Sequence, residues 1–106
     1  MYLRSFVFQI GVKSTEEVIQ RIRSDLIPRL STQPGFFAYY VVALSENRVA
    51  TIRIFEDQDS LESAHEATVG ALDAIVKEFN ITDGIVEESG YDGDVSAGVA
   101  YARLFL

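Results

Sequence analysis

The stretch Pro34–Val42 reads P-G-F-F-A-Y-Y-V-V, a turn followed by seven apolar or aromatic residues. In a β-strand, successive side chains point to opposite faces of the sheet. One layer of helices covers only one face of a sheet, so the other face needs cover from elsewhere. The alternation predicts two apolar faces here, with Phe36, Ala38, Tyr40 and Val42 on one and Phe37, Tyr39 and Val41 on the other.

Apolar periodicity on both sides of this stretch predicts the order strand, helix, strand, strand, helix, strand. A tight hairpin at Ser45–Asn47 makes the two middle strands antiparallel. This is the split βαβ arrangement of ferredoxin-like folds, an α+β sandwich of βαββαβ topology whose antiparallel sheet carries two helices on one face. The expected elements are Tyr2–Ile10, Thr15–Leu30, Phe36–Leu44, Arg48–Phe55, Leu61–Asn80 and Val95–Leu106, with a mobile connection at Thr82–Asp94.

Local signals refine the two helices. Ser14 and Glu17 have the spacing of a capping box at the start of the first helix. Pro28 lacks a backbone N–H, so it predicts a kink or an early end near Asp25–Ile27. Acidic residues gather just before the second helix, where they complement its positive end and lack the spaced ligands of a cation loop. The D-G-D run at Asp92–Asp94 lacks further ligands too, and it indicates a solvated turn.

The uncovered face of the sheet predicts an oligomer. The chain has 106 residues, which is the size of one domain spanning residues 1–106. An open aromatic sheet face forms an apolar patch larger than soluble monomers usually expose. Two copies can cover each other by packing their open faces together. We therefore expect a homodimer through the open sheet face.

Charge and composition exclude several classes of function. The formal net charge is −7, so the surface repels a nucleic-acid backbone. The chain has no cysteine, which excludes disulfides, thiolate nucleophiles and sulfur-ligated metals. No window approaches the ~20 apolar residues of a membrane span, and the N-terminus lacks a signal-peptide pattern. We expect a cytoplasmic protein that binds neither nucleic acid nor membrane.

The hairpin and the second helix carry a family resemblance. Residues 34–65, P-G-F-F-A-Y-Y-V-V-A-L-S-E-N-R-V-A-T-I-R-I-F-E-D-Q-D-S-L-E-S-A-H, and residues 94–101, D-V-S-A-G-V-A-Y, resemble the antibiotic biosynthesis monooxygenase-like (ABM) family of the dimeric α+β barrel superfamily. The resemblance implies a dimer whose sheets enclose an apolar cavity. Several members oxidise aromatic polyketides or quinols with oxygen and use no metal or organic cofactor. Others degrade haem, and many have no known activity.

The sequence departs from the better-understood members at the end of the third strand. Those enzymes often carry a tryptophan there, whereas this chain has no tryptophan and has Phe55 at approximately that place. Phe55 can form the wall of a pocket, but it lacks the indole N–H that donates a hydrogen bond.

The candidate substrate-binding residues are His65, Arg53, Tyr39, Tyr40 and Phe55. His65, the only histidine, matches the histidine of the family's A-H segment and suits proton transfer near neutral pH, or it is a packed helix residue. Arg53 can fix a phenolate or carboxylate oxygen, or it pairs with a carboxylate across the dimer or snorkels to the rim. Tyr39 and Tyr40 point to opposite faces, so at most one offers its hydroxyl to a cavity, and both can instead be packing residues.

These features support two hypotheses from different classes. The first is a cofactor-independent monooxygenase that acts on or binds a small aromatic or quinol-type compound, because a dry cavity that holds such a substrate as its anion lets it react directly with oxygen. The second is a non-catalytic dimeric module of the same fold, with a small-ligand-binding or stress-linked role. No phosphate loop, nucleophile elbow or dinucleotide fingerprint occurs in the sequence, and we predict no metal and no cofactor.

Overall fold

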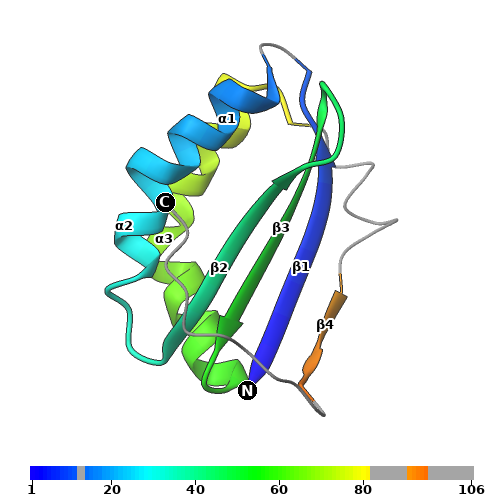
Figure 1. Cartoon of the computed structure of the whole chain (residues 1–106). Helices are drawn as coiled ribbons and strands as arrows, with labels where there is room; N and C mark the ends of the chain where they lie inside the picture. The colour runs from blue at the N-terminus through cyan, green and yellow to red at the C-terminus, as the bar shows by residue number, and fades with distance from the viewer. Residues whose placement is uncertain (12–13, 82–90, 96–106) are drawn as a thin grey trace.

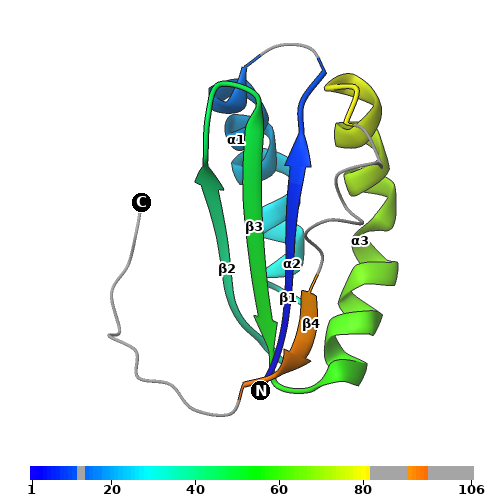
Figure 2. The ribbon, with the colours of Figure 1, turned by 90° about the vertical axis from the view of Figure 1, so that its right-hand side faces the viewer.

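The computed structural model describes residues 1–11, 14–81 and 91–95. Its elements are β1 (Tyr2–Gln9), α1 (Thr15–Arg21), the π-helical segment η1 (Ile22–Leu26), α2 (Ile27–Leu30), β2 (Phe36–Ala43), β3 (Arg48–Phe55), α3 (Gln58–Glu78) and β4 (Tyr91–Asp94). The strands form one antiparallel sheet in the order β2-β3-β1-β4. The helices lie on one face of this sheet (Figure 1), and the opposite face is turned toward the viewer in Figure 2. The predicted α+β ferredoxin-like arrangement is confirmed.

The core lies between the sheet and the helices. The antiparallel register of β1 and β3 places alternate residues of both strands on the helix face. In β3 these residues are all buried, namely Val49, Thr51, Arg53 and Phe55. The helices close the core with Val18, Ile22, Leu26, Leu30, Leu61 and Ile75, and Phe79 at the C-cap of α3 joins them.

The first helix begins at a capping box and changes its winding before a proline. The Ser14 hydroxyl accepts a hydrogen bond from the Glu17 N–H at 3.3 Å, and the Glu17 carboxylate accepts one from the Ser14 N–H at 3.0 Å. Pro28 cannot donate to the carbonyl four residues back, and its ring crowds that carbonyl. The chain widens into a π turn just before it, where the Ile27 N–H donates to the Ile22 carbonyl. The disturbance predicted before Pro28 is thus the segment η1.

The helix α3 is capped at both ends. The Asp57 carboxylate accepts a hydrogen bond from the Ser60 N–H at 2.8 Å, so the acidic residues before this helix include its N-cap, as predicted. At the other end Asn80 has a φ of 49°, the left-handed conformation that commonly ends a helix. Neither α3 nor any other described helix combines the length and the apolar content needed to cross a membrane.

A β-bulge changes which residues of β2 share a face. The register with β3 shifts between Phe36 and Ala38, so Phe37 is an extra residue in β2. Phe36 pairs with Phe55, and their rings meet edge to face with centroids 5.6 Å apart. Phe36 therefore lies on the helix face together with Tyr39. The alternation predicted for this strand was wrong at Phe36, because the bulge restarts the alternation after Phe37.

The fourth strand begins earlier in the sequence than predicted. β4 pairs with β1 over Tyr91–Asp94, where the sequence indicated a solvated turn at the end of a mobile connection. Backbone hydrogen bonds to the edge of β1 define this strand, which its glycine and acidic side chains do not reveal. The Val95 N–H continues the pairing by donating to the Met1 carbonyl at 2.9 Å. The rest of the strand predicted over Val95–Leu106 lies outside the described residues, as do residues 82–90 of the predicted connection.

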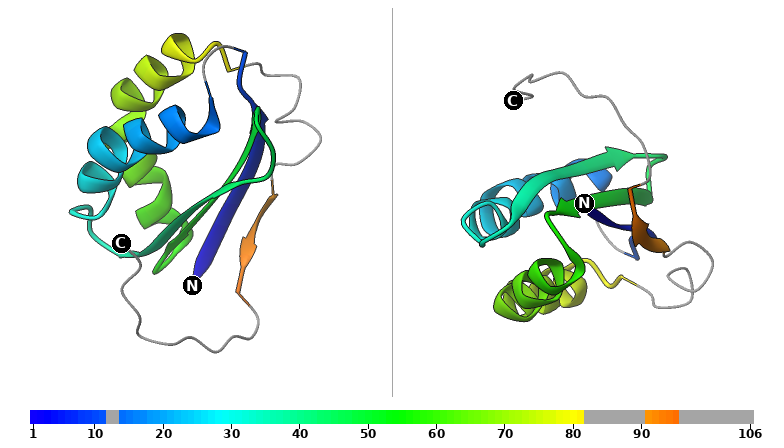
Figure 3. Two further views of the ribbon diagram at one scale, coloured as in Figure 1. Left: turned by 45° about the horizontal axis from the view of Figure 1, so that its top comes forward. Right: turned by 90° about the horizontal axis from the view of Figure 1, so that it is seen from below.

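The face of the sheet away from the helices carries exposed apolar side chains. Tyr40 and Val42 are each 46% exposed, and Leu44 of the same hairpin is 51% exposed. Tyr40 and Val42 pair with residues of β3, so the apolar surface continues across two strands. No described helix covers this side of the sheet (Figure 3). The structure therefore has the open apolar face that the sequence predicts.

Replacing Gly35 with alanine should destabilise the fold. Gly35 has a φ of +81°, and a Cβ at this position would lie 2.6 Å from Ser60 Oγ and 2.7 Å from Ser60 Cβ. The left-handed backbone and the collision should together lower the free energy of unfolding by about 1–3 kcal/mol, measured by urea denaturation. Gly70→Ala is the matched control, because a Cβ there meets no atom within 4 Å and alanine favours a helix. Equal stability of the two variants would contradict this prediction.

Candidate functional site

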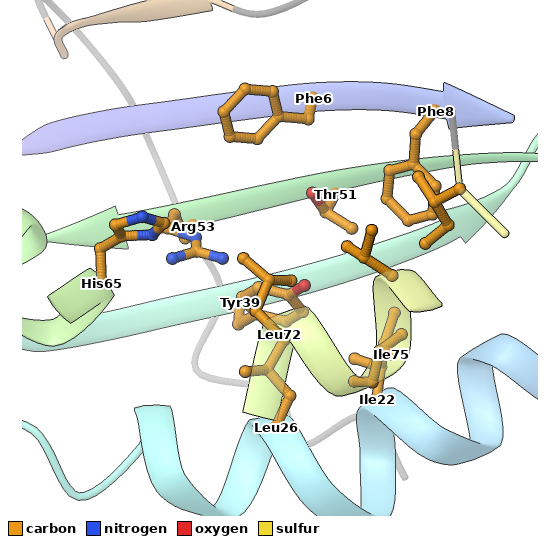
Figure 4. A pocket seen from close by; sticks show the side chains of 12 residues that line it. Phe6, Phe8, Ile22, Leu26, Tyr39, Thr51, Arg53, His65, Leu72 and Ile75 are labelled. Atoms are coloured by element: carbon orange, nitrogen blue, oxygen red, sulfur yellow. The ribbon is translucent and has the colours of Figure 1, made fainter. Parts of the chain in front are cut away.

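A cavity lies between the sheet and the helices, on the face that also holds the core. Its volume is about 180 Å³. Side chains from three strands and from the helices converge on it (Figure 4). Four polar side chains, Tyr39, Thr51, Arg53 and His65, interrupt a lining that is otherwise apolar. The apolar lining consists of Phe6, Phe8, Ile22, Leu26, Leu72, Ile75, Val76 and Ile81.

The register of the strands places the polar residues in one row across the sheet. Arg53 of β3 pairs with Tyr39 of β2 on one side and with Arg4 of β1 on the other. Arg53 is only 4% exposed, and its Cζ lies 5.7 Å from the centre of the Tyr39 ring. Such a contact between a cation and a ring face stabilises a guanidinium that has lost its water. His65 approaches the same region from α3 (Figure 4), so the sheet and the helix both contribute polar groups.

The Tyr39 hydroxyl keeps its proton. Burial raises the pKa of Tyr39 above its ordinary value of 10.0, and this effect outweighs the opposing charge of Arg53 and hydrogen bonding to Thr51 and Arg53. A protonated phenol both donates and accepts hydrogen bonds. Tyr39 can therefore donate a hydrogen bond to an oxygen of a bound molecule.

His65 is neutral at neutral pH. Partial burial lowers the pKa of His65 below its ordinary value of 6.5, and the positive charges of Arg53 and Arg4 lower it further. The carboxylates of Glu62 and Asp73 act in the opposite direction, with smaller effects. A neutral imidazole can accept a proton, which is the property that a general base needs.

An ion pair beside the cavity joins β1 to α3. A hydrogen bond connects Arg4 Nη2 and Glu62 Oε1, with Arg4 largely buried and Glu62 half-exposed. The carboxylate of Glu62 offsets the charge of Arg4. Arg4 does not line the cavity. Among the described residues that do, Arg53 carries the formal positive charge when His65 is neutral.

The structure brings three of the five predicted site residues together at this cavity: Tyr39, Arg53 and His65. Phe55 is fully buried in the core and lies outside the cavity lining. Tyr40 points to the open face, because it is the strand neighbour of Tyr39. The cavity also lies on the helix side of a single chain, whereas the family resemblance implies a cavity enclosed by two sheets.

Thr51 is the polar lining residue that the sequence reasoning missed. A threonine within a strand is a common β-forming residue, and nothing in its sequence neighbourhood marks chemistry. The signal available was its position two residues before Arg53, which places both side chains on one face of β3. In the part of the chain that the structure describes, no three histidine or carboxylate side chains gather as a metal site requires.

Solved structures resemble this one along nearly the whole chain. No protein-family model matches the sequence, and no curated protein matches it closely. SnoaB, a cofactor-independent oxygenase from Streptomyces nogalater, has a TM-score of 0.65 at 16% identity, over 96% of this chain and 97% of that chain. A putative antibiotic biosynthesis monooxygenase from Nitrosomonas europaea has a TM-score of 0.71 at 13% identity, over 92% of this chain and 100% of that chain. A similarly described protein from Deinococcus radiodurans has a TM-score of 0.59 at 16% identity, over 99% of this chain and 100% of that chain.

This chain has the same fold as these solved structures. The resemblance seen in the hairpin and the second helix is thereby confirmed for the architecture. Identities of 13% and 16% are too low to transfer a substrate from one protein of this fold to another. The chemistry of this protein has to be argued from its own cavity.

The titration of His65 tests the electrostatics of the site. His65 is the only histidine, so its imidazole signals in proton NMR report a single group, and we expect a midpoint below 6.5. Arg53→Met should raise the midpoint by removing a positive charge, whereas Arg53→Lys should leave it lowered. Glu62→Gln should lower it further, because the Glu62 charge favours the imidazolium. A wild-type midpoint at or above 6.5 would contradict the partly buried, positively charged environment of His65.

Proposed function

We propose that this protein is a cofactor-independent monooxygenase that acts on a small aromatic or quinol-type compound in the cavity beneath α3. The observation that carries this proposal is the meeting of Tyr39, Arg53 and His65 in a largely apolar cavity. An apolar pocket with a few convergent polar groups and shifted pKa values is the usual form of an active site. The fold supports the same class of activity, since SnoaB is a cofactor-independent oxygenase.

Each polar group has a role toward a quinol. Neutral His65 accepts a proton from the quinol hydroxyl, and Arg53 stabilises the anion that remains. Tyr39 donates a hydrogen bond to the same anion, since it keeps its own proton. The apolar lining excludes water, which strengthens each of these electrostatic contacts.

The quinol anion itself supplies the electrons, and dioxygen is the oxidant. A new C–O bond forms between a ring carbon and dioxygen, and the O–O bond then breaks. One oxygen atom stays on the ring, and the other leaves as water with two protons from the substrate. The quinol loses four electrons, dioxygen gains four, and the products are one hydroxyquinone and one water.

A second candidate function is ligand binding without turnover, and the size of the cavity favours it. Pockets for drug-sized ligands usually measure about 300–1,000 Å³. A cavity of about 180 Å³ leaves little room for dioxygen beside a bound ring. The protein would then be a small-ligand-binding module with the same fold, and oxygen consumption separates the two candidates.

Oxygen consumption with methylhydroquinone tests the proposed reaction. The wild-type protein should consume dissolved oxygen above the spontaneous rate and form the hydroxyquinone. His65→Gln should slow the reaction by about 10²–10⁴-fold, the range expected for loss of a general base. Tyr39→Phe should also slow it, whereas Tyr40→Phe, the matched change on the other face of β2, should not. Oxygen uptake no faster than the spontaneous rate would exclude the monooxygenase. If the ligand still shifted the His65 signals, the small-ligand-binding module would be the remaining candidate function.

The open sheet face supports a second part of the proposal, a homodimer. Tyr40, Val42 and Leu44 form an exposed apolar surface on one hairpin. Soluble monomers rarely keep contiguous apolar patches of this kind in water. Two copies that pack these faces together would bury the exposed residues of both chains. A dimer of this kind does not use the cavity, because the cavity lies on the opposite side of the sheet.

A pair of valine substitutions tests the dimer. Val42 on the open face is 46% exposed, and Val69 on α3 is 40% exposed, so a lysine is equally tolerable at either site in a monomer. The wild-type protein should sediment as a dimer at micromolar concentration. Val42→Lys should sediment as a monomer because it places two charges in the interface, whereas Val69→Lys should stay dimeric. A monomeric wild-type protein, or dissociation caused only by Val69→Lys, would contradict the proposed interface.

A further inference from the structure

The cavity is small for the range of aromatic compounds that the proposed function covers. Its volume of about 180 Å³ is slightly more than the roughly 150 Å³ of an engineered apolar cavity that holds one benzene molecule. One ring with one or two substituents fits such a space, and fused rings exceed it. The walls include Ile22, Leu26 and Ile75, which are buried core residues. A ligand that needs more room on this side of the cavity would have to displace close-packed side chains, which is costly.

Two of the four polar groups lie toward one end of this small space. Figure 4 shows His65 and Arg53 at one end of the cavity and Phe8, Ile22 and Ile75 at the other. A complementary ligand therefore has an oxygen at one end and an apolar ring at the other.

The charges around the cavity favour an anion over a neutral ligand. From the sheet, Arg53 and Arg4 are the charges that act on His65, and from α3 they are Glu62 and Asp73. Glu62 pairs with Arg4 beside the cavity, and Asp73 is exposed on α3. The described lining itself carries the positive charge of Arg53. A hydrogen bond from a guanidinium to an anionic oxygen is shorter and stronger than one to a neutral oxygen.

We propose that the cavity selects one-ring phenols or enols and holds them as anions, with the oxygen at Arg53 and His65 and the ring against Phe8 and Ile75. This inference rests on the proposed function, because it takes for granted that the cavity receives an aromatic compound. It adds two restrictions to that function. Fused-ring compounds are excluded by volume, and neutral one-ring compounds bind weakly because they lack the charge that Arg53 complements.

Binding of 4-nitrophenol tests the charge restriction. Only the anion of this phenol is strongly coloured, so absorbance reports its ionisation directly. Binding to the wild-type protein should lower the midpoint of that ionisation relative to the free compound. Arg53→Met should abolish the shift. The methyl ether 4-nitroanisole has nearly the same shape and cannot ionise, and it should bind about 10- to 100-fold more weakly. Equal binding of the ether and the phenol would overturn the charge restriction.

The fused-ring counterpart 4-nitro-1-naphthol tests the size restriction. It should bind the wild-type protein at least about tenfold more weakly than 4-nitrophenol. Leu72→Ala enlarges the cavity and should raise naphthol affinity about tenfold, whereas Val69→Ala on the exposed side of α3 should leave it unchanged. Naphthol binding to the wild-type protein as tight as that of the phenol would overturn this inference and leave the proposed function standing. If no aromatic compound of either size binds, both fail.

Discussion

Arg53 carries a full positive charge into the space between the sheet and α3, where it is 4% exposed. Removing a guanidinium from water costs several kcal/mol, and the surroundings must compensate for it. The face of the Tyr39 ring lies 5.7 Å away, and the pairing of β2 with β3 holds it there. Partial burial lowers the pKa of His65, and the positive charge of Arg53 lowers it further. One buried residue thus contributes to the protonation state of its neighbour and brings a positive charge to the cavity.

The strand β2 contributes side chains to both faces of the sheet. Tyr39 faces the cavity, and its neighbour Tyr40 faces the open side. The bulge at Phe37 brings Phe36 onto the helix face, where its ring packs against Phe55 at one end of the core. Chemistry and association can therefore use opposite sides of one small sheet. Changes to the open face should affect assembly and leave the polar row of the cavity in place.

Much of the fold follows from patterns that act over a few residues. The capping box at Ser14, the N-cap region before α3 and the alternation of β3 each depend on local spacing, and the structure confirms them. The bulge at Phe37 and the strand β4 depend on partners far away in the chain, and the sequence did not reveal either. Backbone hydrogen bonds decide both, whereas sequence patterns report side chains.

The candidate site was predictable in its residue types but not in its shape. Arg53 and His65 stand out in the sequence because a charged residue in a buried strand and a single histidine are both uncommon. Thr51 does not stand out, since its importance comes from facing the same cavity. The volume of that cavity depends on how closely α3 and η1 approach the sheet. That distance is set by the packing of many side chains at once, so no local pattern encodes it.

The central claim is that the ligand binds between the sheet and the helices, beside Arg53, rather than on the open face. Chemical-shift mapping by NMR with 4-nitrophenol tests this claim directly. The described strands have some residues that face the cavity and others that face the open side, so the shifted residues identify the face that binds. The largest shifts should fall on Phe6, Thr51, Arg53 and His65, with Tyr40, Val42 and Ala50 affected little. Shifts concentrated on Tyr40, Val42 and Ala50 would place the ligand on the open face and contradict the account.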